Sequence, residues 1–392
     1  MYRYPIVSMF FVALVGCSPG ALAFKLNPCL RILTFSDTGL AQRAINGWNP
    51  CAAVPERLQS TVHEHMTLAA IYKYRGVPIQ RGVAKGAEKA AINYMRERSW
   101  KVGNGPNHET FGLMFGTWWN DDPMMHLWGE WTDFGSGVKH LQRLFSGKAH
   151  ISYAGGVAGC TVPADQHLAY ASHFGKLQHL HFMTSLGRER PESERLETTI
   201  EDALAWIEFA YKVAIGEIAA TAPLTHEDEQ RLKMPSVARN LCLKDPRNVK
   251  VRSVFTRQGP STSVNIEFRN RLTPDVALGS IFHLLQDSFS PAHACRVEMQ
   301  SEGKAMAVLR RVFNYNEQDH KEHAAQDGYP AWLTEYARTG VHRYANDPVA
   351  TGAWLLRAVD DRMPWDQVRM ELLSTIFKTE PSGQTHSTSA CI

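Results

Sequence analysis

Apolar residues recur at helical spacing along most of the chain beyond its N-terminal region. The segment 56–75 carries them along one face and stops at Gly76. The same period predicts further helices at 84–98, 164–186, 195–219, 275–289, 305–327 and 365–377. Because this pattern dominates, we predict an all-α fold built as a bundle of many helices.

Two segments depart from helical periodicity. Residues 151–163 are rich in glycine and other small residues. Residues 249–268 alternate β-branched side chains around a Gln-Gly-Pro turn, which predicts a small β-hairpin insertion. We assign residues 24–378 to one helical domain and 379–392 to a polar tail that is loose unless Cys391 ties it down.

The first residues have the pattern of an export signal. Arg3 is followed by a short apolar run at 5–16 and by the small-x-small site Ala21-Leu22-Ala23. Residues 1–23 are therefore predicted to be a signal peptide, with the mature chain secreted from Phe24. A lipobox-like stretch ending at Cys17 is the competing interpretation, in which that cysteine anchors a lipoprotein.

Composition narrows the class of function. The chain has 392 residues, 44% of them hydrophobic, which is ordinary for a globular protein, and a net charge of +3 makes no case for nucleic acid. Seven cysteines lack any CxxC pair, which argues against a cysteine-based zinc site. Six remain after the leader, so disulfides are expected, with their pairing left open.

The stretch HLLQDSFSPAH, residues 283–293, carries the strongest chemical signal. His283 and Asp287 are four residues apart and so share one helix face. Pro291 cannot continue that helix, and His293 lies beyond it, where it can face a second, neighbouring ion. The competing interpretation is a core histidine, since apolar residues flank His283 on both sides.

A second pair follows in DHKEHAAQDGYP. His323 and Asp327 are again four residues apart, His320 lies one turn earlier, and Gly328 begins the helix stop. Solvated surface histidines are the alternative. Two pairs together favour a metal site, because histidine and aspartate are common ligands of divalent cations.

These motifs resemble the zinc-dependent phospholipase C superfamily, which also contains the fungal single-strand nucleases. More narrowly, LQDSFSPAHACR and NDDP are similar to the bacterial zinc metallophospholipases C. The resemblance implies an all-α fold with two or three zinc ions in a cleft. It assigns a first zinc to His283 and Asp287, with Asp287 bridging to another, and a further zinc to the three ligands His293, His323 and Asp327.

The resemblance also requires ligands from the N-terminal half. It points to His63, with His65 as the near alternative. In NDDP it favours Asp122 over Asp121 and makes Asp122 the general base as well. Some relatives add the amine of an N-terminal tryptophan, but the new terminus here would be Phe24, far upstream of His63.

The first zinc needs one more histidine, and here the chain does not reproduce the family spacing. We favour His173, with His181 next. Three other histidines stay open: His126, His140 and His150.

The narrower resemblance implies a secreted enzyme that hydrolyses glycerophospholipids at a membrane surface. We expect a monomer that binds no nucleic acid, since the low net charge does not favour a polyanion. Aromatic residues crowd the segment 111–131 and could cage a choline, meet lipid, stack bases or form core. The alternatives are a zinc-dependent single-strand nuclease and a non-catalytic zinc-binding protein.

The leader generates the first prediction. Residues 1–30 fused to a reporter that is active only after export should give signal, and N-terminal sequencing should begin near Phe24. Recovery of the reporter in membranes with an acylated Cys17 would instead support the lipobox.

Overall fold

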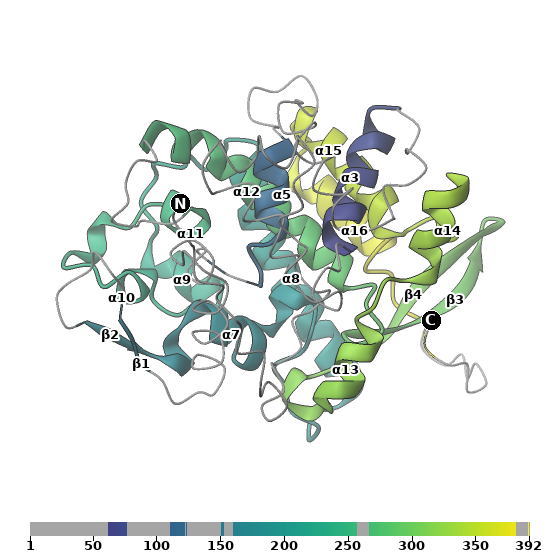
Figure 1. Cartoon of the computed structure of the whole chain (residues 1–392), viewed down its shortest axis with the longest axis horizontal. Coiled ribbons are helices and arrows are strands. Elements are labelled where there is room, and N and C mark those ends of the chain that lie inside the picture. Colours follow the sequence, from purple (N-terminus) through teal and green to yellow (C-terminus); the bar gives the residue numbers. More distant parts are fainter. Residues whose placement is uncertain are drawn as a thin grey trace, which may run out of the picture.

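The computed structural model describes residues 62–76, 110–121, 123, 150–152, 160–256, 266–381 and 391. Helix α12 (Ile266–Asp287) runs through the middle of the molecule (Figure 1). Around it pack α3 (Val62–Tyr74), α5 (Thr110–Thr117), α8 (Glu192–Ala214) and α15 (Pro348–Asp360). The predicted leader and the predicted helix at 84–98 lie outside the described residues.

Helix α12 is buried on every side from Leu272 to its end. A helix surrounded by other helices needs apolar side chains all round, and α12 has them in its second half. The helix starts at Ile266, earlier than the predicted residue 275. Pro274 therefore lies inside the helix. Proline removes one backbone donor, and the neighbouring Thr273 hydroxyl donates to the Arg269 carbonyl at 2.7 Å in the same turn.

Two glycines let α5 and α12 touch through their backbones. A Cβ on Gly279 would lie 2.3 Å from the Leu113 carbonyl oxygen and 2.6 Å from the Gly116 Cα. A Cβ on Gly116 would lie 2.3 Å from the Val276 carbonyl oxygen. Only glycine fits at this crossing, and the close approach holds the end of α5 beside the last two turns of α12.

Shorter elements complete the helical body. The α-helices are α7 (Leu168–Phe174), α9 (His226–Arg231), α10 (Val237–Asn240), α11 (Arg252–Phe255), α13 (His320–Gln326), α14 (Ala331–Thr339) and α16 (Trp365–Ser374). The 3-10 turns are η3 (Ala164–Gln166), η4 (Gln178–His181), η5 (Pro246–Asn248) and η6 (Tyr315–Glu317). The segment predicted as one helix at 164–186 is thus broken into η3, α7 and η4.

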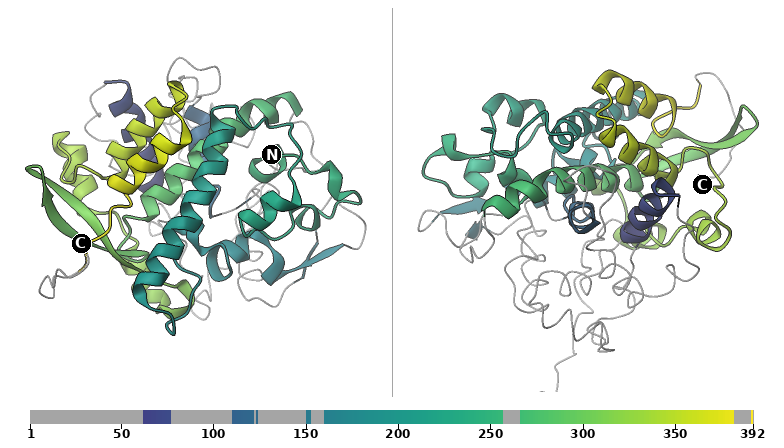
Figure 2. Two further views of the ribbon diagram at one scale, coloured as in Figure 1. Left: turned by 180° about the vertical axis from the view of Figure 1, so that it is seen from behind. Right: turned by 90° about the horizontal axis from the view of Figure 1, so that it is seen from above.

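The described residues include two antiparallel two-stranded sheets, so the fold is helix-rich rather than purely all-α. Strand β1 (His150–Ser152) pairs with β2 (Thr161–Pro163), and β3 (Ala294–Ser301) pairs with β4 (Lys304–Val312). Glu302 and Gly303 have φ of 51° and 76°, as a two-residue hairpin turn requires. Both views in Figure 2 show the β3–β4 hairpin projecting from one end of the body.

Two sequence predictions were wrong here. The helix predicted at 305–327 is strand β4 over its first part, because pairing with β3 overrides the helix-forming tendency of its alanine, leucine and methionine residues. The hairpin predicted at 249–268 is occupied by α11 and by the start of α12 in its described part. Its β-branched residues are core: Val249, Val251 and Val254 are at most 2% exposed.

Arg296 on β3 anchors the turn that follows α12. Its buried guanidinium donates to the carbonyls of Ser288 at 2.6 Å, Ala307 at 2.7 Å and Ile376 at 2.9 Å. The same group lies 4.0 Å from the centroid of the Phe289 ring. One side chain thus joins the end of α12, strand β4 and the segment after α16.

Two disulfides lie among the described residues, Cys160–Cys242 and Cys295–Cys391. The second disulfide ties the polar tail to β3 through Cys391, a possibility that the sequence analysis left open. The start of the tail is also held, because the Leu309 backbone on β4 bonds to Lys378 and Glu380. No helix in the described part of the chain is long and apolar enough to cross a membrane.

The glycine crossing generates the second prediction. Gly279→Ala should lower the free energy of unfolding by about 1–3 kcal/mol, because the new methyl meets backbone that cannot rotate away. Chemical denaturation measures this. Gly328→Ala is the matched control, since its Cβ would meet only the Ala325 carbonyl at 3.6 Å. Equal stability of the two variants would contradict the tight crossing.

Candidate metal centre

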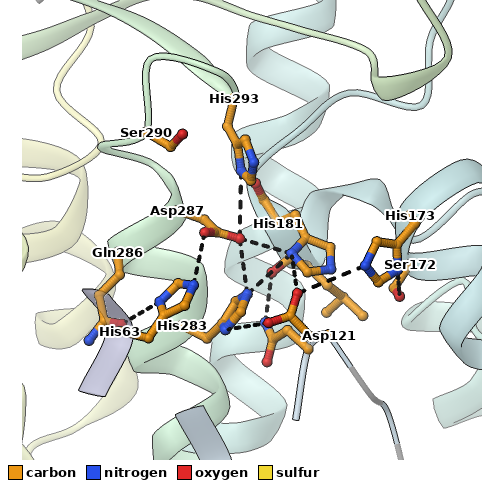
Figure 3. A network of polar contacts seen from close by, with 12 residues as sticks. His63, Asp121, Ser172, His173, His181, His283, Gln286, Asp287, Ser290 and His293 are labelled. Carbon is orange, nitrogen blue, oxygen red and sulfur yellow. Dashed lines mark hydrogen bonds and ion pairs between the residues drawn. The ribbon is translucent and has the colours of Figure 1, made fainter. Parts of the chain in front are cut away.

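Nine histidine and aspartate side chains meet in the interior, each at most 3% exposed. We call the group around Asp287 the first cluster; its members are His63, Asp121, His173, His181, His283 and Asp287. The second cluster consists of His293, His323 and Asp327. Figure 3 shows the first cluster with His293 above it. These buried groups could hold metal ions.

Asp287 is the hub of the first cluster. Its Oδ2 lies 2.8 Å from His181 Nδ1 and 3.0 Å from His283 Nε2. Its Oδ1 lies 3.4 Å from His63 Nε2. The two oxygens of one carboxylate therefore face different imidazoles.

Asp121 closes the opposite side of the first cluster. Its Oδ1 lies 3.8 Å from His173 Nε2 and 4.0 Å from His181 Nδ1, and its Oδ2 lies 4.0 Å from His283 Nδ1. The side chain comes from the turn just after α5, so the glycine crossing brings it to α12. His173 comes from the last turn of α7.

The second cluster lies directly beside the first. His293 Nε2 is 3.7 Å from Asp327 Oδ1, and His323 Nε2 is 3.7 Å from Asp327 Oδ2. The Nδ1 of His293 is 3.6 Å from Asp287 Oδ2, which joins the clusters. Ser290 donates its hydroxyl to Asp327 Oδ1 at 2.6 Å and fixes that carboxylate.

Local structure explains why these residues converge. His283 and Asp287 lie one turn apart on α12, and His323 and Asp327 lie one turn apart at α13. After α12 the chain turns at Ser288–Pro291, so His293 points back toward the helix end. The 3-10 turn η4 serves both clusters, since His181 gives its side chain to the first and its carbonyl oxygen to His293 Nδ1, at 2.7 Å.

Five of the six imidazoles are oriented in the same way. In each of them, Nδ1 carries the hydrogen and donates it to an oxygen. The lone pair that can bind a metal is therefore on Nε2. The acceptors are Gln286 Oε1 for His63, the Ala169 carbonyl for His173, the Thr117 carbonyl for His283, the His181 carbonyl for His293 and Gln318 Oε1 for His323, all at 2.6–2.8 Å. His181 is the exception, because its Nδ1 faces Asp287.

Burial sets the charge of these groups. Desolvation lowers the pKa of His173 to about 4 and of His283 to about 3; desolvation, together with the nearby His323, lowers the pKa of His293 well below its usual value. The imidazoles are therefore neutral near pH 7, which is the form that binds a metal. Burial raises the pKa of Asp287 well above its usual range, so an ionised Asp287 needs a cation beside it.

The distances fit a small divalent cation. Zinc binds nitrogen and oxygen at about 2.0–2.2 Å in tetrahedral sites, which separates neighbouring donors by about 3.3–3.6 Å. Four sets of three donors each have their ligand atoms within 4.8 Å of one another. Three sets lie in the first cluster and one in the second, so each cluster could hold a metal ion.

The structure places the predicted ligands as follows. It brings together His63, His173, His283, Asp287, His293, His323 and Asp327. It adds the two alternatives Asp121 and His181 to the first cluster. Asp122, His126 and His140 lie outside the described residues; His150 falls in β1 and His320 begins α13.

His65 takes a different position from His63. It is buried, and its ring meets the edge of Tyr329 with the centroids 5.6 Å apart. It belongs to none of the donor sets found among the described residues. Of the aromatic segment, Phe115, Trp118 and Trp119 are at most 6% exposed and form core, while Trp128 and Trp131 lie outside the described residues.

Sequence reasoning missed the two glutamines that orient His63 and His323. The signal for Gln286 was present, since it is a long polar residue in a helix whose neighbours are apolar. Such a residue, when buried, needs hydrogen-bond partners. Gln318 precedes α13 in a polar stretch and carried no comparable signal.

Comparisons of the chain with known protein families, with curated proteins and with solved structures found no match. The chemistry of the centre must therefore follow from its donors and their geometry.

The shared carboxylate generates the third prediction. Wild-type protein should hold at least two zinc ions, and Asp287→Ala should lose more zinc than any change outside the clusters, because Asp287 faces both donor groups. Elemental analysis of dialysed protein measures this. His65→Ala is the buried control, with folding checked by circular dichroism. Equal zinc in the two variants would mean that Asp287 is not a ligand.

Proposed function

We propose that the protein is a zinc-dependent phosphoric diester hydrolase of the phospholipase C type, which releases diacylglycerol and a phosphorylated head group from glycerophospholipids. The observation that carries the proposal is the contact between the clusters, 3.6 Å from His293 Nδ1 to Asp287 Oδ2. It allows two cations to sit near enough to share one phosphate group. The resemblance of LQDSFSPAHACR and NDDP supports the same reaction class.

The donor set supports zinc. Imidazole and carboxylate donors in a buried site suit zinc well, whereas calcium and magnesium prefer oxygen ligands. Bound zinc would lower the pKa of a water molecule and neutralise the charge on phosphate oxygens.

Charge in the centre supports a phosphate diester as the substrate. Burial lowers the pKa of five of the six imidazoles and so favours their neutral form, and the carboxylates of the two clusters are those of Asp121, Asp287 and Asp327. Two or three divalent cations exceed these three carboxylates and leave a net positive centre. A buried positive centre attracts the single negative charge of a phosphodiester.

The proton acceptor for water is assigned to the NDDP segment. The resemblance gives this role to Asp122. Its neighbour in the sequence, Asp121, is a member of the first cluster. An ionised carboxylate held beside cations can accept that proton and pass it on.

A lipid is favoured over single-stranded nucleic acid by the low net charge and by the pairing of several arginines with glutamates among the described residues. Arg188 and Arg195 both contact Glu317, Arg310 contacts Glu380, and Arg369 contacts Glu201. A polyanion usually binds where such charges are open. The predicted leader and the disulfides of the described part are in keeping with a secreted enzyme, which we propose acts as a monomer at a membrane surface.

The fourth prediction is the reaction itself. Purified protein should release phosphocholine from phosphatidylcholine micelles, phenanthroline should stop the release, and added zinc should restore it. Mass spectrometry identifies the products, and Asp122→Asn should lower the rate by about 100-fold or more if it is the general base. His65→Ala is the control.

Other products would point elsewhere. Phosphatidic acid with free choline would mean that the bond on the head-group side of the phosphate is cut, and not the bond on the diacylglycerol side. Cleavage of single-stranded DNA without lipid turnover would assign the chain to a nuclease. Zinc binding without either activity would indicate a non-catalytic zinc protein.

A further inference from the structure

A neutral imidazole carries one proton, and only its other nitrogen can bind a metal. Each ligand histidine of the centre therefore needs a partner that selects the proton position. Backbone carbonyls do this for His173, His283 and His293. For His63 and His323 the partner is the side-chain amide of a glutamine, which is a group that mutation can remove.

A chain of hydrogen bonds fixes the direction of the Gln286 amide. A carbonyl oxygen can only accept, so the Thr117 hydroxyl donates to the Leu113 carbonyl at 2.7 Å. Thr117 is then free to accept from the Thr67 hydroxyl at 3.3 Å. Thr67 in turn accepts from Gln286 Nε2 at 2.9 Å. The amide nitrogen of Gln286 thus donates to Thr67, and the amide oxygen faces His63.

That oxygen decides the tautomer of His63. Gln286 Oε1 lies 2.7 Å from His63 Nδ1, and because the oxygen has no hydrogen, the imidazole must donate from Nδ1. The lone pair then resides on Nε2, which is 3.4 Å from Asp287 Oδ1. The hydrogen-bond chain that starts at the Leu113 carbonyl on α5 thus determines that His63 presents Nε2, and not Nδ1, to the first cluster.

Gln318 acts in the same way on the second cluster. Its Nε2 donates to the Ala292 carbonyl at 2.6 Å, so its Oε1 must be the atom 2.6 Å from His323 Nδ1. His323 Nε2 then carries the lone pair, 3.7 Å from Asp327 Oδ2. In both clusters an amide whose nitrogen is committed to protein oxygen presents its own oxygen to a histidine.

We propose that Gln286 and Gln318 are positioning residues. Each orients a histidine that binds a different metal ion. Gln286 controls the ion beside His63 and Asp287, and Gln318 controls the ion held by His323 with its second-cluster partners. The inference rests on the metal centre of the proposed function. An amide suits this task because it orients the imidazole without adding a fourth negative charge to three buried carboxylates.

The test uses Gln286→Met and Gln318→Met in the full chain, since methionine keeps the length of the side chain and removes the acceptor. Zinc affinity and stoichiometry are measured by equilibrium dialysis against a chelator, followed by elemental analysis. Each variant should bind one ion about 10–100-fold more weakly and keep the other. Gln286→Glu should restore the lost ion, because a carboxylate still accepts from Nδ1.

Gln230→Met is the matched control. Gln230 Nε2 also contacts a histidine, His226, at 3.0 Å, but on the exposed face of α9 and outside both clusters. Zinc binding should be unchanged in this variant. A merely structural role for the buried glutamines would weaken all ions together, which would overturn the proposal.

The remaining outcomes separate this inference from the proposed function. Wild-type protein that binds no zinc would sink both. Wild-type protein that binds zinc, with both methionine variants binding it equally well, would sink only the role of the glutamines. If a methionine variant does not fold, nitrogen-15 spectra of wild-type histidines decide. Protonated Nδ1 in His63 and His323 supports the proposal, and protonated Nε2 overturns it.

Discussion

Three carboxylates and six imidazoles share one buried volume, and this concentration of polar groups is the constraint on which the rest of the structure depends. Carboxylates lose several kcal/mol of hydration on burial unless cations or donors replace the water. Most of the imidazoles are held by oxygens that leave one nitrogen facing inward. Such a set of donors could hold metal ions, whose positive charge would offset the buried carboxylates.

The surrounding architecture keeps those groups at fixed separations. Helix α12 is the common wall, and the Gly116–Gly279 contact brings the α5 end within reach of it. Arg296 holds the turn that returns His293 to the helix end. The hub carboxylate Asp287 therefore contacts residues contributed by α3, η4 and the post-helix turn, although these are far apart in the sequence.

How much of this could be predicted depended on distance along the chain. The pairs His283/Asp287 and His323/Asp327 could be predicted, because two residues that are four apart in a helix lie on the same face. Asp121 and His181 were only alternatives, because nothing local shows which of several acids and histidines meets a helix more than a hundred residues later. Strand β4 was mistaken for helix for a related reason, since its conformation comes from its partner β3 rather than from its own residues.

The order of the disulfides has a consequence for how the chain matures. Among the described cysteines, Cys160 joins Cys242 and Cys295 joins Cys391, so the two bonds follow one another and do not interleave. If the chain is threaded through a membrane N-terminus first, as its leader predicts, Cys242 emerges 82 residues after its partner and before Cys295 has appeared. An oxidase that joins these four cysteines as they arrive therefore makes both native bonds without reshuffling. The second bond could close only once Cys391 emerges, 96 residues after Cys295, so the hairpin beside His293 would be covalently secured late in such a translocation.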